Sequence, residues 1–162
     1  MPITLLRVDE RLIHGQVVVG WGERYHVDRI VVVDDELRRS EWEQELYCLG
    51  VPPNVDAAFV DVEEARSLLP QWHSDPKHTF VLVRDVPTLA RLAEAGLLDG
   101  LEVNLGGIHS APGRHRVLPY LFLSDEEMLD LRRIADRGVA ISARDVPASR
   151  AIPLAELPDH RH

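Results

Sequence analysis

Apolar runs of strand length alternate with segments of helical periodicity along the chain, and this alternation limits the fold more than any other feature of the sequence. Apolar runs predict strands near 3–8, 29–34, 55–60, 79–84, 101–105, 117–123 and 138–143. Helical spacing predicts helices near 15–25, 36–49, 62–70, 87–96 and 125–137. Runs such as Ile30–Val33 are apolar throughout, as in strands buried on both faces. The sequence therefore predicts an open three-layer α/β/α fold with a mostly parallel central sheet.

Local signals mark where several of these helices begin and end. Ser124 and Glu127 form a predicted capping box, and Pro87 lies where a first helical turn tolerates proline. Asp34 and Asp35 follow a strand and are interpreted as caps of the next helix rather than as site residues. No linker or repeat divides the 162 residues, so we expect a single domain over 1–162. Its tail from about residue 146 is expected either to pack loosely or to add a last short element.

Composition excludes several classes of function. A net charge of -9 disfavours nucleic-acid binding and broad binding to anionic membranes. No segment approaches 18 apolar residues, so no membrane insertion is expected. The single cysteine, Cys48, rules out an internal disulfide, and it is expected to be an inert buried thiol, with Trp21 and Trp42 also packed. No metal is predicted, because metal-ligand spacing is absent from the candidate histidines His73, His78, His160 and His162.

One turn concentrates charge directly after the first predicted strand, in the stretch from Arg7 to Gln16. The side chain of His14 is largely neutral near pH 7 because its ordinary pKa is about 6.5, so it can act as a nucleophile. We expect Asp9 to hydrogen bond one ring nitrogen and Arg11 to neutralise a transferring phosphoryl group. The start of the following helix offers free N–H groups to an anion. The expected phosphate contacts are Arg7, Leu12, Ile13, Gly15 and Gln16.

Other polar residues leave two interpretations open. Arg84 ends a strand and either helps to hold phosphate or is a solvated charge. Arg114 and His115 either contact a partner or form an exposed basic turn. His109 is interpreted as a packed or loop histidine rather than as a second phosphoryl acceptor.

The stretch RVDERLIHGQVVVGW, residues 7–21, resembles the signature of the IIB subunit of the mannose/fructose/sorbose family of bacterial sugar phosphotransferase systems (PTS). The resemblance continues through VVDDE at 32–36, PPNV at 52–55, AG at 95–96 and VNLGGIH at 103–109, and it covers the chain to about residue 145. It is long and includes the charged turn.

This resemblance implies a protein-N(π)-phosphohistidine–sugar phosphotransferase that needs no cofactor. By motif position, His14 would accept a phosphoryl group from a IIA domain and donate it to a hexose or amino sugar during uptake through the membrane subunits IIC and IID. Asp9, Arg11 and the backbone around Gly15 would line the phosphate loop. The protein would be cytoplasmic and would associate with the inner face of the membrane through IIC and IID. The sugar and the oligomeric state, including a homo-oligomer, are left open.

The segment after the glycine pair departs from the family pattern. Family members have smaller or more polar residues where this chain has Leu118, Pro119, Tyr120 and Phe122. This difference bears on the choice of partner, with Arg114, His115 and Tyr120 as the expected partner surface. Pro119 cannot donate a ladder hydrogen bond, so it predicts an edge strand or a bulge.

Two rival functions are drawn from other classes. Histidine phosphatases and phosphomutases carry an R-H-G triplet after their first strand, where this chain has Ile13-His14-Gly15, and hydrolysis of phosphate monoesters would support that class. A regulatory phosphocarrier that never meets a transporter is the second alternative. Neighbouring genes for IIC and IID would favour transport, and their absence would favour regulation.

Overall fold

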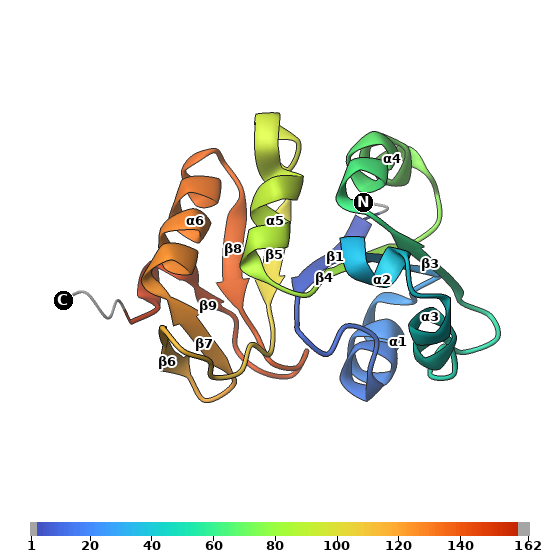
Figure 1. Cartoon of the computed structure of the whole chain (residues 1–162), viewed down its shortest axis with the longest axis horizontal. Coiled ribbons are helices and arrows are strands. Elements are labelled where there is room, and N and C mark those ends of the chain that lie inside the picture. The colour runs from blue at the N-terminus through green and yellow to red at the C-terminus, as the bar shows by residue number, and fades with distance from the viewer. Residues whose placement is uncertain (1–2, 159–162) are drawn as a thin grey trace.

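A seven-stranded sheet forms the centre of this computed structural model, which describes residues 3–158 (Figure 1). The strand order is β3-β2-β4-β1-β5-β8-β9, and every adjacent pair is parallel except β8 with β9, which is antiparallel. The strands are β1 (Ile3–Val8), β2 (Arg29–Val33), β3 (Asp56–Val60), β4 (Thr79–Val83), β5 (Glu102–Leu105), β8 (Ala140–Ala143) and β9 (Ile152–Pro153).

Helices cover both faces of this sheet. One face packs against α4 (Val62–Ser74), α5 (Val86–Ala93) and α6 (Asp125–Asp136). The other packs against the π-helix η1 (Gln16–Trp21), α1 (Gly22–Tyr25), α2 (Asp35–Arg38) and α3 (Glu41–Cys48). Two short 3-10 turns, η2 (Glu94–Gly96) and η3 (Leu154–Glu156), complete the helical elements of residues 3–158. The predicted three-layer α/β/α fold is confirmed.

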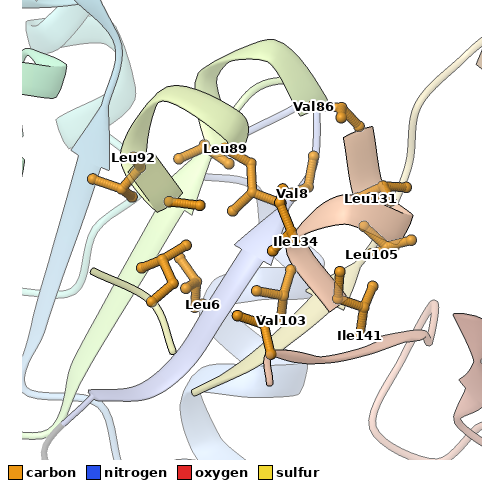
Figure 2. Packing of buried hydrophobic residues seen from close by; sticks show 14 of the residues in the cluster. Leu6, Val8, Val86, Leu89, Leu92, Val103, Leu105, Leu131, Ile134 and Ile141 are labelled. Carbon is orange, nitrogen blue, oxygen red and sulfur yellow. The ribbon is translucent and has the colours of Figure 1, made fainter. Parts of the chain in front are cut away.

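The larger of the two cores lies between the sheet and the helices α5 and α6 (Figure 2). Leu6 and Val8 of β1 point into it beside Val103 of β5, and they meet Leu89 of α5 and Ile134 of α6. Burying an aliphatic side chain of this kind contributes about 1.5–3 kcal/mol relative to exposure. This packing fixes the central strands whose ends carry the charged turn.

The predicted helix caps are present. The Ser124 hydroxyl accepts a hydrogen bond from the Glu127 N–H, and the Glu127 carboxylate accepts one from the Ser124 N–H. Asp34 caps α2 by accepting from the Leu37 N–H. Both caps satisfy donors that a helix start leaves unpaired.

Three predicted elements differ from the structure. The single strand expected over 117–123 is a separate hairpin of β6 (Arg114–Leu118) and β7 (Leu121–Ser124), because the chain turns at Pro119 and Tyr120, with a register shift just before the turn. The helix expected over 36–49 is broken between α2 and α3, where the side chain of Gln44 caps the last carbonyls of α2. The helix expected to end at Pro70 continues to Ser74.

Two residues expected to be buried are exposed, and the tail, as far as residue 158, is an ordered part of the fold. Trp42 and Cys48 are exposed on α3, whereas Trp21 is buried as expected. The tail supplies the last short element, since β9 pairs with β8, and Leu154 and Leu157 are buried. His160 and His162 lie outside the described residues. Among residues 3–158, no helix is long and apolar enough to cross a membrane.

The strand order places a topological switch point at the carboxyl end of β1. The chain leaves β1 for helices on one face of the sheet, and it leaves the neighbouring strands β4 and β5 for helices on the opposite face. Ligands of open α/β sheets bind at such switch points, beyond the carboxyl ends of the strands. The charged turn occupies this position.

Candidate functional site

The loop from Asp9 to Gly15 is fixed between the ends of the two strands that flank β1. The Asp9 N–H donates to the Val83 carbonyl at the end of β4, at 2.9 Å. The Glu10 N–H donates to the Gly107 carbonyl just after β5, also at 2.9 Å. These bonds attach the loop to the rigid centre of the sheet, so its side chains have defined positions.

The carboxylate of Asp9 joins the two arginines of the loop. It is fully buried and accepts from Arg7 Nη2 at 3.1 Å and from Arg11 Nη2 at 2.8 Å. Its other oxygen accepts from the Arg11 N–H and Nε, each at 3.0 Å. Burial by itself raises the pKa of Asp9, but the hydrogen bonds from Arg11 and the charge of Arg7 outweigh burial and lower that pKa below its ordinary value. Asp9 is therefore a carboxylate at neutral pH.

Arg7 lies beneath the loop and is completely buried. Its guanidinium donates to Asp9 and to three acceptors far along the chain. The guanidinium carbon also lies over the Trp21 ring, 5.2 Å from the ring centroid. The distant acceptors are the Asn104 side chain and the carbonyls of Arg144 and Asp145. With its donors turned to protein acceptors, Arg7 is not placed to contact a phosphoryl group. The expectation of a phosphate contact is corrected: Arg7 positions Asp9 and the chain after β8.

A glycine pair after β5 makes room for these arginines. A Cβ atom on Gly106 would lie 2.6 Å from Asp9 Oδ2 and closer still to the Arg7 guanidinium. On Gly107 it would lie 3.3 Å from Arg11 Nη2. Neither glycine was assigned a role from the sequence, although the pair stands in the family-like NLGG segment. Their role depends on side chains about a hundred residues earlier in the chain.

The imidazole of His14 is held by a backbone carbonyl rather than by Asp9. Nδ1 lies 2.8 Å from the Leu12 carbonyl oxygen, which can only accept, so Nδ1 carries the proton in this arrangement. Nε2 is buried without a hydrogen-bond partner and lies 3.9 Å from Asp9 Oδ2, too far for a hydrogen bond. The expected Asp9–His14 hydrogen bond is therefore absent in this arrangement, and Asp9 acts on the ring through its charge.

Leu12 adopts a left-handed backbone conformation, with φ of 55°, that is costly for a residue with a side chain. Its side chain is buried, its N–H donates to the Asp9 carbonyl, and its own carbonyl accepts from His14. This leaves Leu12 no group for phosphate, so its expected role as a phosphate contact is corrected. Its conformation instead directs its carbonyl at the His14 ring.

The environment keeps His14 in its neutral form. Burial lowers the pKa of His14, and although the Leu12 carbonyl and the Asp9 charge oppose this, the net pKa lies below the ordinary value of 6.5. A neutral ring has an unprotonated nitrogen near pH 7, which a nucleophile requires. The side chain remains 16% exposed.

The outer edge of the loop faces solvent. Arg11 is 46% exposed on its side chain, although one side of its guanidinium is bound to Asp9. Gly15 and Gln16 are exposed, and a Cβ on Gly15 would meet nothing within 4 Å. Ile13 packs its side chain in the core and is 7% exposed. The open backbone at the helix start and the Arg11 guanidinium thus border His14.

Arg84 follows β4, next to the loop. It donates from Nε to Asp34 Oδ2 at 3.1 Å and remains 40% exposed. Asp34 therefore caps a helix and also orients this arginine. Arg84 is near enough to the loop to share a hollow with Ile13, and its contact with phosphate stays a prediction.

The expected partner residues fall into two groups. Arg114 belongs to β6 and is largely buried, where it pairs with Glu10 at 2.9 Å and with Glu127 at 3.1 Å, so it anchors the β6–β7 hairpin to the loop. It is not part of an exposed basic turn. His109 is exposed and pairs with Glu10. The roles of His115, beside Asp125, and of Tyr120, at the hairpin turn, remain predictions.

Within residues 3–158, no cluster of three His, Cys, Asp or Glu side chains could hold a metal ion.

Comparisons with known proteins match the whole described chain. The model of the family "PTS system sorbose subfamily IIB component" matches residues 3–161. The N-acetylgalactosamine-specific phosphotransferase enzyme IIB component 1 of Escherichia coli K12 is 30% identical over 151 residues, covering 91% of this chain and 93% of the relative.

A further relative and a solved structure are similar to the chain over most of its length. The E. coli K12 mannose-specific EIIAB component is 29% identical over 97% of this chain, which spans 48% of that longer relative. The crystal structure of manxB from Thermoanaerobacter tengcongensis superimposes with a TM-score of 0.84 at 30% identity, covering 95% of this chain and 93% of that one. The range that the family model matches includes the loop that carries His14.

Proposed function

The chain belongs to the sorbose subfamily of PTS IIB components, which are phosphotransferases, and we propose that it carries the transferred phosphoryl group on His14. The observation that carries this proposal is the His14 ring itself, which is neutral, partly exposed and bordered by Arg11 at the carboxyl end of β1. Neutrality leaves one ring nitrogen with a lone pair, partial exposure gives access to the ring, and Arg11 supplies positive charge nearby.

The donor would be a IIA domain, and the acceptor would be a sugar taken up through membrane subunits IIC and IID. The match to a mannose-specific EIIAB component, a relative whose name combines A and B components, supports a IIA partner. The relatives are named for different sugars, N-acetylgalactosamine and mannose among them. Hexoses or amino sugars are accordingly the proposed substrate class. A place at the inner face of the membrane would follow from binding IIC and IID.

In the transfer step, a ring nitrogen of His14 attacks phosphorus as the N–P bond to the donor histidine breaks. The donor nitrogen leaves with its electron pair, so no net proton is released. Arg11 would lie beside the transferring group and offset its charge, which is the main requirement of phosphoryl transfer.

Acceptance on N(π), which is Nδ1, requires that the ring proton move to Nε2 and that the Leu12 contact be released. The geometry supports Nδ1 because Nε2 is buried and faces the negative charge of Asp9 at 3.9 Å. That charge repels an incoming phosphoryl anion and favours a proton on Nε2. Asp9 would thereby select the reacting nitrogen, even without a hydrogen bond in the resting arrangement.

The direct test is to incubate the chain with phosphoenolpyruvate, enzyme I, HPr and a matching IIA domain. Intact-mass and peptide mapping should find one acid-labile phosphoryl group on His14, and ³¹P NMR should place it on Nδ1. An adduct elsewhere, or none while several matching IIA domains are themselves phosphorylated, would contradict the proposal. Phosphorylation on His14 without transfer to any sugar in membranes containing IIC and IID would instead favour a regulatory carrier.

Arg11→Ala should slow acceptance by about a hundredfold, the usual cost of removing one group that stabilises transition-state charge. Some acceptance should remain, because His14 and the open backbone at Gly15 are unchanged. Single-turnover transfer from the phosphorylated IIA domain measures this rate. Arg11→Lys is the matched control: it keeps the charge, so it should recover part of the rate, while losing the paired contacts with Asp9. Equal rates in wild type and Arg11→Ala would remove Arg11 from the mechanism.

The pH dependence of acceptance should follow the lowered pKa of His14. Protonation removes the lone pair, so the rate should be constant above about pH 7 and should fall at acid pH, with a midpoint below the ordinary value of about 6.5. NMR titration of the His14 ring gives the pKa, and single-turnover rates give the kinetic midpoint. A midpoint above about 6.5 would show that the ring is stabilised as a cation, contrary to the role of burial.

A further inference from the structure

An apolar stripe on α3 faces solvent beside the phosphate loop. Trp42, Leu46 and Leu49 recur at the spacing of one helix face, and they are 65%, 57% and 83% exposed. The helix contains no fully buried residue, although Tyr47 packs on its inner side against Phe59. Contiguous exposed apolar surface of this kind marks an interaction site more often than isolated exposed side chains do.

A hollow of about 380 Å³ connects this stripe to the site. Residues in and next to α3 line the hollow together with Ile13, directly before His14, and Arg84, directly after β4. The lining residues are Ile13, Trp42, Glu43, Leu46, Tyr47, Gly50 and Arg84. The hollow is therefore continuous with the surface that any phosphoryl donor has to cover.

The side chains around the hollow have the character of an interface centre. Tryptophan, tyrosine and arginine are the residues in which binding energy is most often concentrated. Arg84 is held by Asp34 at 3.1 Å, so part of its conformational freedom is already lost before binding. The lining of the hollow includes the half-exposed Arg84 beside Glu43. Arg11, also half-exposed, lies two residues before Ile13 in the loop that reaches the hollow.

We propose that this hollow, with Trp42 and Leu46, is the docking site of the IIA domain that delivers the phosphoryl group to His14. A protruding apolar side chain of that domain would fill the hollow, and acidic groups around it would meet Arg84 and Arg11. This inference rests on the proposed function, because it takes His14 as the acceptor.

The geometry of transfer favours the IIA domain over the membrane subunits as the partner that covers the hollow. In the first transfer both reacting nitrogens belong to side chains fixed on folded proteins, so the two surfaces must meet closely around His14. In the second transfer the reacting hydroxyl belongs to a small sugar, and its contact with the phosphoryl group does not by itself need a partner that covers α3. Ile13 lies in the hollow and next to His14 in the chain. The donor is thus the partner that has to contact this surface.

The test compares Trp42→Ala and Leu46→Ala with wild type in phosphoryl transfer from a phosphorylated IIA domain that the wild-type chain accepts. Each variant should raise the apparent KM for that domain about tenfold, the effect of losing a central interface residue. The rate at saturation should stay within about twofold, because the lost contact contributes binding and not chemistry. Melting temperatures should be unchanged, since both side chains are exposed.

Glu45→Ala is the matched control. Glu45 is exposed on the same helix and does not line the hollow, so its replacement should leave the KM for the IIA domain unchanged. An equal rise in KM for all three variants would show a general change in α3 and would overturn the docking site.

Other outcomes also overturn the proposal. An unchanged KM in both hollow variants would do so, as would a defect confined to transfer to sugar in membranes with IIC and IID, which would assign the hollow to the transporter. A wild-type dimer in sedimentation that Trp42→Ala dissociates would assign it to a second copy of the chain. Failure of the proposed function is separate: peptide mapping of the wild type would then find no phosphoryl group on His14.

Discussion

His14→Ala should abolish phosphoryl acceptance and leave the fold intact. The substitution removes the only side chain of the loop that offers a neutral nitrogen nucleophile, so no slower route is left at this site. The side chain makes one hydrogen bond, to the Leu12 carbonyl, and lies in a loop at the edge of the core. We therefore expect a change in the free energy of unfolding of about 1 kcal/mol or less. Intact mass after incubation with the donor system measures acceptance, and thermal unfolding measures stability.

His109→Ala is the matched control for this experiment. His109 is a second histidine close to the loop, paired with Glu10 and exposed to solvent. Because its contact is with Glu10 and not with His14 or Asp9, its replacement should leave one phosphoryl group per chain. Phosphorylation of His14→Ala to the wild-type level, or loss of phosphorylation in His109→Ala with the donor still charged, would move the acceptor away from His14.

Arg7→Met should cause the largest loss of stability among the site variants. Methionine keeps much of the volume but removes a buried cation on which Asp9, Asn104 and two backbone carbonyls depend. Removing one partner of a buried ion pair costs about 3–5 kcal/mol, because the remaining groups stay buried and lose their donors. For a chain of this size, that loss corresponds to a fall in melting temperature of roughly 10 °C. Chemical denaturation and thermal scans measure both quantities.

Arg150→Met is the control for the change of residue type. Arg150 is 76% exposed and pairs at 3.8 Å with Glu156, a surface contact worth about 1 kcal/mol or less. Its replacement should leave the melting temperature nearly unchanged. Arg7→Lys should fall between wild type and Arg7→Met, since it keeps the charge but cannot reproduce the several directed hydrogen bonds. Similar stabilities for Arg7→Met and Arg150→Met would show that the buried network contributes little.

Arg7→Met should also change how the free energy of unfolding depends on pH in the acid range. The pKa of Asp9 is lowered in the folded protein, so its ionised form adds stability that is present above its unfolded pKa of about 3.9 and is lost as the pH falls through the folded value. Without Arg7 the pKa of Asp9 should rise and this contribution should shrink. The stability difference between wild type and Arg7→Met should therefore narrow below about pH 4.

The hydrogen bonds of Arg7 also connect the C-terminal tail to the site. Arg7 binds the carbonyls of Arg144 and Asp145, and the chain then continues into β9 and the buried Leu154. The end of the fold is thus connected to Asp9 through one guanidinium. From the sequence, the tail could be described only as loosely packed or as a short element, because Arg7 and its acceptors are separated by more than a hundred residues.

The sequence alone determined the layers of the fold and the position of the loop that carries His14. Alternating apolar periodicity reports backbone conformation and burial locally, so it predicts β1 to β5 with the helices between them, and the loop with His14 after β1. It did not find the β6–β7 hairpin, because a run from Val117 to Leu123 is apolar whether or not it turns at Pro119.

Only the tertiary structure decided what most of the charged residues do. The stretch from Arg7 to His14 shows two arginines and two acids, but not that Arg7 is buried under Asp9 while Arg11 faces solvent. Those roles depend on distant partners such as Asn104, 97 residues away from Arg7 in sequence, and on the space left by Gly106. The exposure of Trp42 was likewise decided by how α3 sits on the sheet. Local pattern fixes an element, whereas a side chain's role is fixed by what the fold brings beside it.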